Sequence, residues 1–265
     1  MSDKLNQALG RLSCLAIGGL VLGSFAAVTP LPVVADEEVD TPAAQHAHDP
    51  TDIWDIARGG QLYDNWMSTL EADEPSRTHP AYPAEGQQEG AATWRCKECH
   101  GWDYKGKEGA YGSGSHFTGI KGIRDVADMN PAELHEIIMN EIHGFTEQQI
   151  PHSAMEKLAL FLSRGQLDTD RYIDRATKMA RGNPRRGAQF YQTICAVCHG
   201  FEGKDMNFGS TEEPEYVGTV CSDNPWEALH KIRFGQPGVG MVALTVLDTD
   251  DLVDILAYCQ TLPAE

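Results

Sequence analysis

The residues best suited to chemistry in this sequence lie in two copies of one motif. Two cysteines and a histidine recur at one spacing: Cys96, Cys99 and His100, then Cys195, Cys198 and His199. Cysteines three positions apart on a helix lie about one turn from each other, so each can form a thioether to one vinyl group of the same porphyrin. Since the next histidine can then ligate the iron, the motif predicts covalent attachment of haem c.

Zinc is the competing interpretation of this motif, because Cys and His are also zinc ligands. A structural zinc site needs four of them, and one Cys-x-x-Cys-His supplies three. Two copies, each opening the same order of elements, favour two covalently bound haems over zinc or a disulfide.

An internal repeat surrounds the motifs. Asn130-Pro131 followed by Leu134-His135-Glu136-Ile137 recurs as Asn224-Pro225 followed by Leu229-His230-Lys231-Ile232. Each half then ends in an amphipathic helix. We therefore expect two domains of one kind, at 53–165 and 182–265, with a charged linker at 166–181.

Helix start signals place the elements that must position the motifs. Asn130, Asn183 and Asn224 each precede a proline, the pattern of an N-cap followed by proline in the first turn. Ser153 to Glu156 has the spacing of a capping box, and Asp248 is expected to open the last helix. No convincing strand pattern is present, so the predicted fold class is all-α with long loops.

The first 35 residues have the features of a secretory signal peptide. Lys4 and Arg11 precede an apolar run at 12–28, and Ala35 is a suitable cleavage position. We expect a disordered tether at 36–52, rich in Asp, Glu, Pro and Ala. The expected location is the periplasm, and an uncleaved leader that anchors the chain in the membrane is the alternative.

With these motifs, helices and a Gly-Met loop in its second half, the sequence resembles the class I cytochrome c family in tandem, as in dihaem cytochromes such as cytochrome c4. The resemblance covers about 53–262 and implies electron transfer. The family places a methionine before the final helix, and Met241 occupies that position, 42 residues after His199. Its thioether predicts the higher reduction potential for this haem.

The first half has no methionine at the matching position. The internal repeat places His143 there, 43 residues after His100, which predicts two histidine ligands at the first iron. Met139, His152, Met155 and His116 are the alternatives, and an open iron site is another. Outside the motifs, Cys221 and Cys259 could form a disulfide or remain buried thiols.

The acidic composition limits the partners that the protein can bind. The formal net charge is −18, which argues against nucleic acid or an anionic membrane as the partner. Membrane association is expected only through an uncleaved leader. The charge is compatible with redox donor and acceptor proteins that present basic docking surfaces, and equally with simple solubility.

Three functions are compatible with these features. The first is an electron carrier or electron-transfer subunit, with no catalytic residues of its own. The second is a dihaem oxidoreductase, acting on peroxide or sulfur compounds, with a labile distal ligand at the first haem. Against it, the first half has no cysteine outside its motif. The third is a docking subunit of a membrane complex.

Overall fold

The computed structural model describes residues 50–264, which belong to one structural unit. The predicted signal peptide and all but the last residues of the predicted tether lie outside the described residues. Within 50–264 the regular elements are helices, with two isolated bridges and no strand, so the expected all-α class is confirmed there. No helix in that range is long and apolar enough to cross a membrane.

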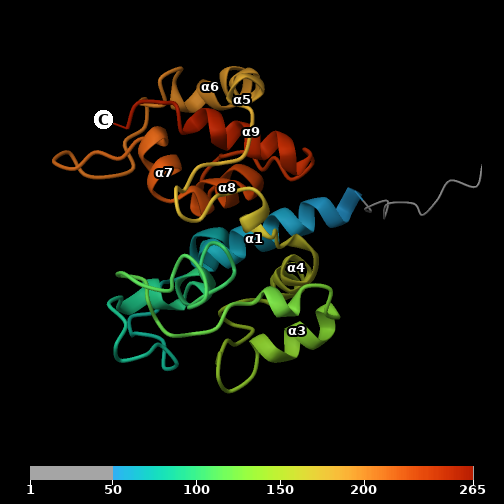
Figure 1. Ribbon diagram of the computed structural model, residues 1–265. Helices are drawn as coiled ribbons and strands as arrows, with labels where there is room; N and C mark the ends of the chain where they lie inside the picture. Colours follow the sequence, from blue (N-terminus) through green and yellow to red (C-terminus); the bar gives the residue numbers. More distant parts are fainter. Residues whose placement is uncertain (1–49, 265) are drawn as a thin grey trace, which may run out of the picture. The chain divides into compact units, whose positions relative to one another are not determined.

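Nine α-helices follow one another between residues 50 and 264. They are α1 (Pro50–Leu70), α2 (Cys96–His100), α3 (Pro131–Ile138), α4 (His152–Leu160), α5 (Pro184–Phe190), α6 (Ala196–His199), α7 (Val217–Asp223), α8 (Pro225–Phe234) and α9 (Thr249–Cys259). Long loops connect them, and α1 lies against both α4 and α8 (Figure 1).

The asparagine caps form as the sequence predicts. The side chains of Asn130, Asn183 and Asn224 accept hydrogen bonds from backbone N–H groups in the first turns of α3, α5 and α8. The expected capping box at Ser153 is wrong. The N-cap of α4 is Pro151, two residues earlier, because its carbonyl already accepts the N–H groups of Ala154 and Met155.

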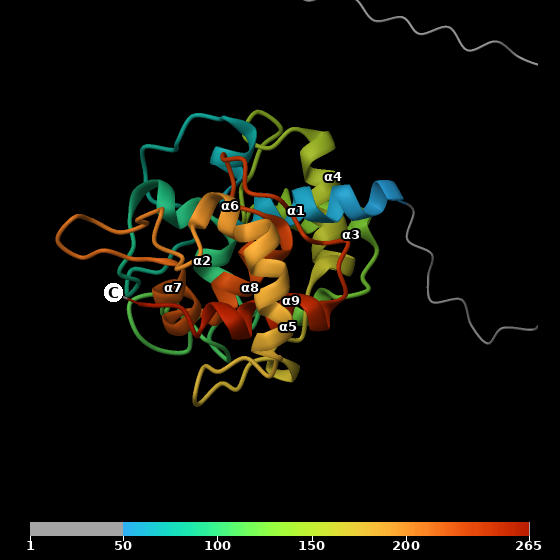
Figure 2. The ribbon, with the colours of Figure 1, turned by 90° about the horizontal axis from the view of Figure 1, so that it is seen from above.

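In each half, the first helix crosses the last helix at a glycine. In the second half α5 crosses α9 (Figure 2), and a Cβ on Gly187 would collide with the backbone of Asp254. In the first half α1 crosses α4, and a Cβ on Gly59 would collide with the carbonyl of Lys157. Glycine at both positions therefore lets two helix backbones approach closely.

Two hydrophobic clusters fill the interior, one around each motif. The first joins α1, α3 and α4, and the second joins α7, α8 and α9. The clusters exchange residues between the halves: Trp102 and Tyr111 belong to the second, and Phe234 belongs to the first. The described halves are therefore packed into each other, and the domain boundaries predicted above stay predictions.

Candidate functional site: two Cys-x-x-Cys-His motifs

Helix α2 consists of the first motif and orients its histidine. The Nδ1 of His100 lies 2.9 Å from the carbonyl oxygen of Lys121. Because a carbonyl only accepts, Nδ1 carries the proton and Nε2 keeps a free lone pair. Burial lowers the pKa of His100 to about 4, so the ring is neutral near pH 7. A neutral ring with a free Nε2 is the form that binds a metal ion.

The structure brings His143 close to His100. Their ring centroids lie 6.3 Å apart, with 39° between the ring planes. The Nδ1 of His143 donates to the carbonyl of Ile137 at 2.9 Å, which again leaves Nε2 free. His100 at the end of α2 and His143 in the loop between α3 and α4 can therefore each offer one lone pair to a metal ion.

His79 holds the loop that carries His143, and sequence reasoning missed it. Its Nε2 donates to the carbonyl of His143 at 2.7 Å, and its Nδ1 accepts from the N–H of Ala81 at 3.1 Å. The ring packs against Trp94 and Phe145. A lone histidine in a proline- and glycine-containing insertion gives no sequence signal for this role.

The other candidates for the first distal ligand have different surroundings. Met155 is fully buried in the first hydrophobic cluster, and Met139 packs against that cluster. His116 stacks on Tyr111 and pairs with Glu98. His152 is exposed, next to His135.

The second motif follows α5 through a π-helical turn, Tyr191–Cys195, that leads into α6. Cys198 is exposed, and His199 lies 5.9 Å from the ring of Phe208. The Nδ1 of His199 is buried without a hydrogen-bond partner. Met241 is half-buried in the loop between α8 and α9, where its carbonyl packs closely on Gly235.

The middle residues of the two motifs have different environments. Lys97 and Glu98 are buried and form an ion pair at 2.7 Å. Burial alone would raise the pKa of Glu98, but His116 and Lys97 lower it to about 2, so the carboxylate is charged. Val197, at the position of Glu98, is exposed. One motif is therefore covered and the other is open.

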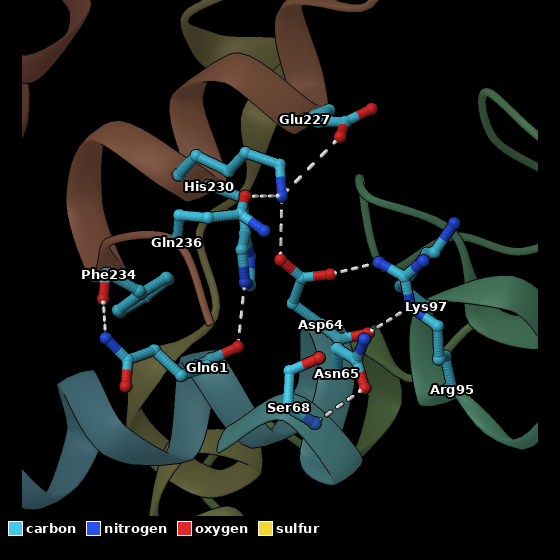
Figure 3. A network of polar contacts seen from close by, with 12 residues as sticks. Gln61, Asp64, Asn65, Ser68, Arg95, Lys97, Glu227, His230, Phe234 and Gln236 are labelled. Carbon is cyan, nitrogen blue, oxygen red and sulfur yellow. Dashed lines mark hydrogen bonds and ion pairs between the residues drawn. The ribbon is translucent and has the colours of Figure 1, made fainter. Parts of the chain in front are cut away.

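A buried ion cluster connects the halves near the first motif (Figure 3). The carboxylate of Asp64 on α1 is fully buried and pairs with Arg95 and with Lys231 of α8. His230 lies beside it, with its Nε2 donating to the carbonyl of Gly60 at 2.9 Å. Sequence reasoning did not find this cluster, because Asp64 and Lys231 are 167 positions apart.

Cys221 and Cys259 face each other inside the second half. Both thiols are buried and free in the structure. A hydrogen bond with Cys221, together with burial, raises the pKa of Cys259 well above its ordinary value. Contact between α7 and α9 thus places the two thiols together.

Comparison with known proteins finds one family match, within the second half of the chain. Residues 182–259 match the family model described as cytochrome C oxidase, cbb3-type, subunit III. The match supports a cytochrome c, which implies covalently bound haem c and haem-based electron transfer. No curated protein and no solved structure matches the chain. Residues 50–264 contain no group of three or more His, Cys, Asp or Glu placed to hold a metal ion.

Proposed function

We propose that the protein is an exported dihaem c-type cytochrome that carries electrons between redox proteins. Cys96, Cys99, Cys195 and Cys198 hold the two haems. His100 and His143 ligate the first iron, and His199 and Met241 ligate the second. The haems, when bound, supply one-electron oxidation and reduction. The residues of the chain attach the haems and supply the ligands of the two irons.

One observation carries the proposal beyond the matched second half. A neutral imidazole binds a metal ion through its unprotonated nitrogen. The ring centres of His100 and His143 lie 6.3 Å apart, and both rings keep Nε2 free. This supports a second haem in the first half, with two histidine ligands.

The different distal ligands support a carrier with two potentials. A thioether stabilises ferrous iron relative to a second imidazole, so the haem at Met241 has the higher potential. A chain with two such haems can accept an electron at one potential and deliver it at another. A closed bis-histidine site does not favour the alternative, a dihaem oxidoreductase.

Haem content and ligand variants test the proposal. The full chain, produced in a host that attaches haem c, is expected to contain two covalent haems and to show two reduction waves. His143→Ala is expected to change only the spectrum of the lower-potential haem, and Met241→Ala only that of the other. His152→Ala and Met206→Ala are the matched controls. One haem per chain, or a carbon monoxide affinity of the wild-type first haem equal to that of the His143→Ala protein, would contradict the proposal.

A further inference from the structure

The two motifs carry the same kinds of residue beside them but differ in exposure. Trp102 follows the first motif and is 1% exposed, whereas Phe201 at the matching position is 70% exposed. Glu98 is 1% exposed and Val197, its counterpart, is 80% exposed. We call this surface, formed by the motif and the residues after it, the motif face. It is covered in the first half and open in the second.

Basic side chains cover the motif face of the first half. The ammonium of Lys231 lies 5.2 Å from the ring centre of Trp102, and His230 packs on the same ring. The carboxylate of Asp103, the next residue, is fully buried and accepts from Arg175 at 2.9 Å. Trp102 and Asp103, an aromatic residue followed by an acid, therefore contact two cations: Lys231 of the second half and Arg175 of the linker.

The second half repeats that pair as Phe201 and Glu202 but leaves it open. Glu202 is exposed, like Phe201. Backbone hydrogen bonds from Gly203 to Gly200 and from Asp205 to His199 hold this turn against the motif. The open surface is therefore an ordered one.

Further acids surround the open motif face. The N–H of Phe208 donates to the carbonyl of Glu215 at 2.8 Å, which fixes Glu215 beside the ring that neighbours His199. Between 201 and 215 the chain has five acids and one base, Lys204. An apolar centre with a polar, charged rim is the usual composition of a protein interface.

We propose that the open motif face of the second half, formed by Val197, Phe201, Glu202, Asp205 and Glu215, docks a redox protein with basic residues around an apolar contact. The proposal rests on the electron-transfer function proposed above. In the first half, Lys231 and Arg175 contact the matching aromatic and acidic residues, so basic residues of a partner would complement Phe201 and Glu202. A second copy of this chain, with a net charge of −18, would be repelled.

Electron exchange with a basic protein tests this surface. The probe is a reduced, lysine-rich monohaem cytochrome c, which loses one electron as the full dihaem chain gains it. Stopped-flow rate constants are measured at an ionic strength of about 10 mM and again at about 150 mM, where surface charges are screened. The variants are Phe201→Ser and Glu202→Gln. Glu147→Gln, an exposed acid of the first half, is the matched control for net charge.

The proposal predicts a local effect. At low salt Glu202→Gln lowers the second-order rate constant about two- to fivefold, the range for one exposed ion pair. Phe201→Ser lowers it about tenfold, as expected for an aromatic contact at the centre of an interface. Glu147→Gln leaves it within about 1.5-fold, and high salt removes most of the Glu202 effect.

Several results would overturn the proposal. Equal losses for Glu202→Gln and Glu147→Gln would mean that net charge alone attracts the probe, and no loss for either motif-face variant would exclude this surface. Self-association that Phe201→Ser abolishes would assign the face to a second copy instead. Haem content and reduction by ascorbate, measured on every variant, separate these results from failure of the electron-transfer function itself.

Discussion

Lys231 of α8 donates to the buried carboxylate of Asp64 on α1 at 2.8 Å, and this bond joins the two halves of the chain. Lys231 also contacts Glu227 and Gln236, while Arg95 pairs with the other oxygen of Asp64 (Figure 3). Removing one member of a buried pair leaves a charge without its partner, which is more costly than removing both.

Lys231→Met is therefore expected to lower the free energy of unfolding by about 3 kcal/mol, since Arg95 alone remains at Asp64. Lys121→Met is the control, because the pair of Lys121 with Asp125 is exposed and worth at most about 1 kcal/mol. Urea unfolding of the full protein measures both. Equal effects of the two variants would contradict a stabilising role of the buried pair.

Acid should weaken the same cluster. Burial alone would raise the pKa of Asp64, but Lys231, Arg95 and His230 together lower it below the ordinary value of 3.8. A lowered carboxyl pKa gives stability that is present above pH 3.8 and is lost as the pH falls through the folded-state pKa. Asp64→Asn is expected to flatten the decline of stability in that acidic range, measured by urea unfolding at each pH.

His230 should make the stability of the fold depend on pH in a range above that of Asp64. Its Nε2 donates to Gly60, so its Nδ1 accepts from the hydroxyl of Tyr104 at 2.9 Å, and the ring is neutral. Burial lowers its pKa to about 4 from 6.5. The unfolded state therefore binds a proton first, and up to about 3 kcal/mol of stability is lost as the pH falls from 6.5 to 4.

The variant His230→Gln isolates this contribution from other buried histidines. Glutamine can donate to Gly60 and accept from Tyr104 without titrating, so about 1 kcal/mol or less is lost at pH 7. Its unfolding free energy should fall less steeply than that of the wild type between pH 6.5 and 4. Parallel curves for the two proteins would refute the assignment.

Replacing Gly187, where α5 crosses α9, with alanine should lower stability, although helix propensity alone would predict an increase. Alanine is favoured over glycine in a helix by about 1 kcal/mol, yet a Cβ on Gly187 would collide with the backbone of Asp254. Gly187→Ala should therefore destabilise the protein, by about 1–3 kcal/mol. Gln189→Ala, at an exposed position of the same helix, is the control in thermal unfolding. A more stable Gly187→Ala protein would disprove the close contact.

Sequence patterns predicted the parts of the structure that depend on local chemistry. The Asn-Pro caps of α3, α5 and α8 follow from the residues themselves, because side-chain capping and the fixed φ of proline act within one turn. The position of His143 followed from alignment within the chain, and the structure brings it to His100. Helix α7 was not predicted, since no typical N-cap residue precedes Val217–Asp223 and the segment has no clear apolar period; in the structure the hydroxyl of Thr219 accepts from the N–H of Tyr216.

Other parts of the site depend on contacts between distant segments, which no local pattern encodes. An aromatic residue follows each motif, but residue type alone does not predict that Trp102 is buried while Phe201 is exposed to solvent. Asp64 and Lys231 are ordinary charged residues until α1 and α8 meet. The carbonyl that orients His100 belongs to the backbone of Lys121, and any residue there would supply it.

His79 should determine how firmly His143 holds the first iron. Because its Nε2 donates to the carbonyl of His143, His79→Ala frees the loop at the cost of one hydrogen bond, worth about 1 kcal/mol. In the ferrous protein, carbon monoxide competes with His143, so its affinity for the first haem should rise about fivefold, while the second haem is unchanged. His152→Ala, an exposed histidine in the same half, should leave the affinity at its wild-type value. Unchanged carbon monoxide affinity in His79→Ala would show that this hydrogen bond does not position the ligand, even if the variant is less stable.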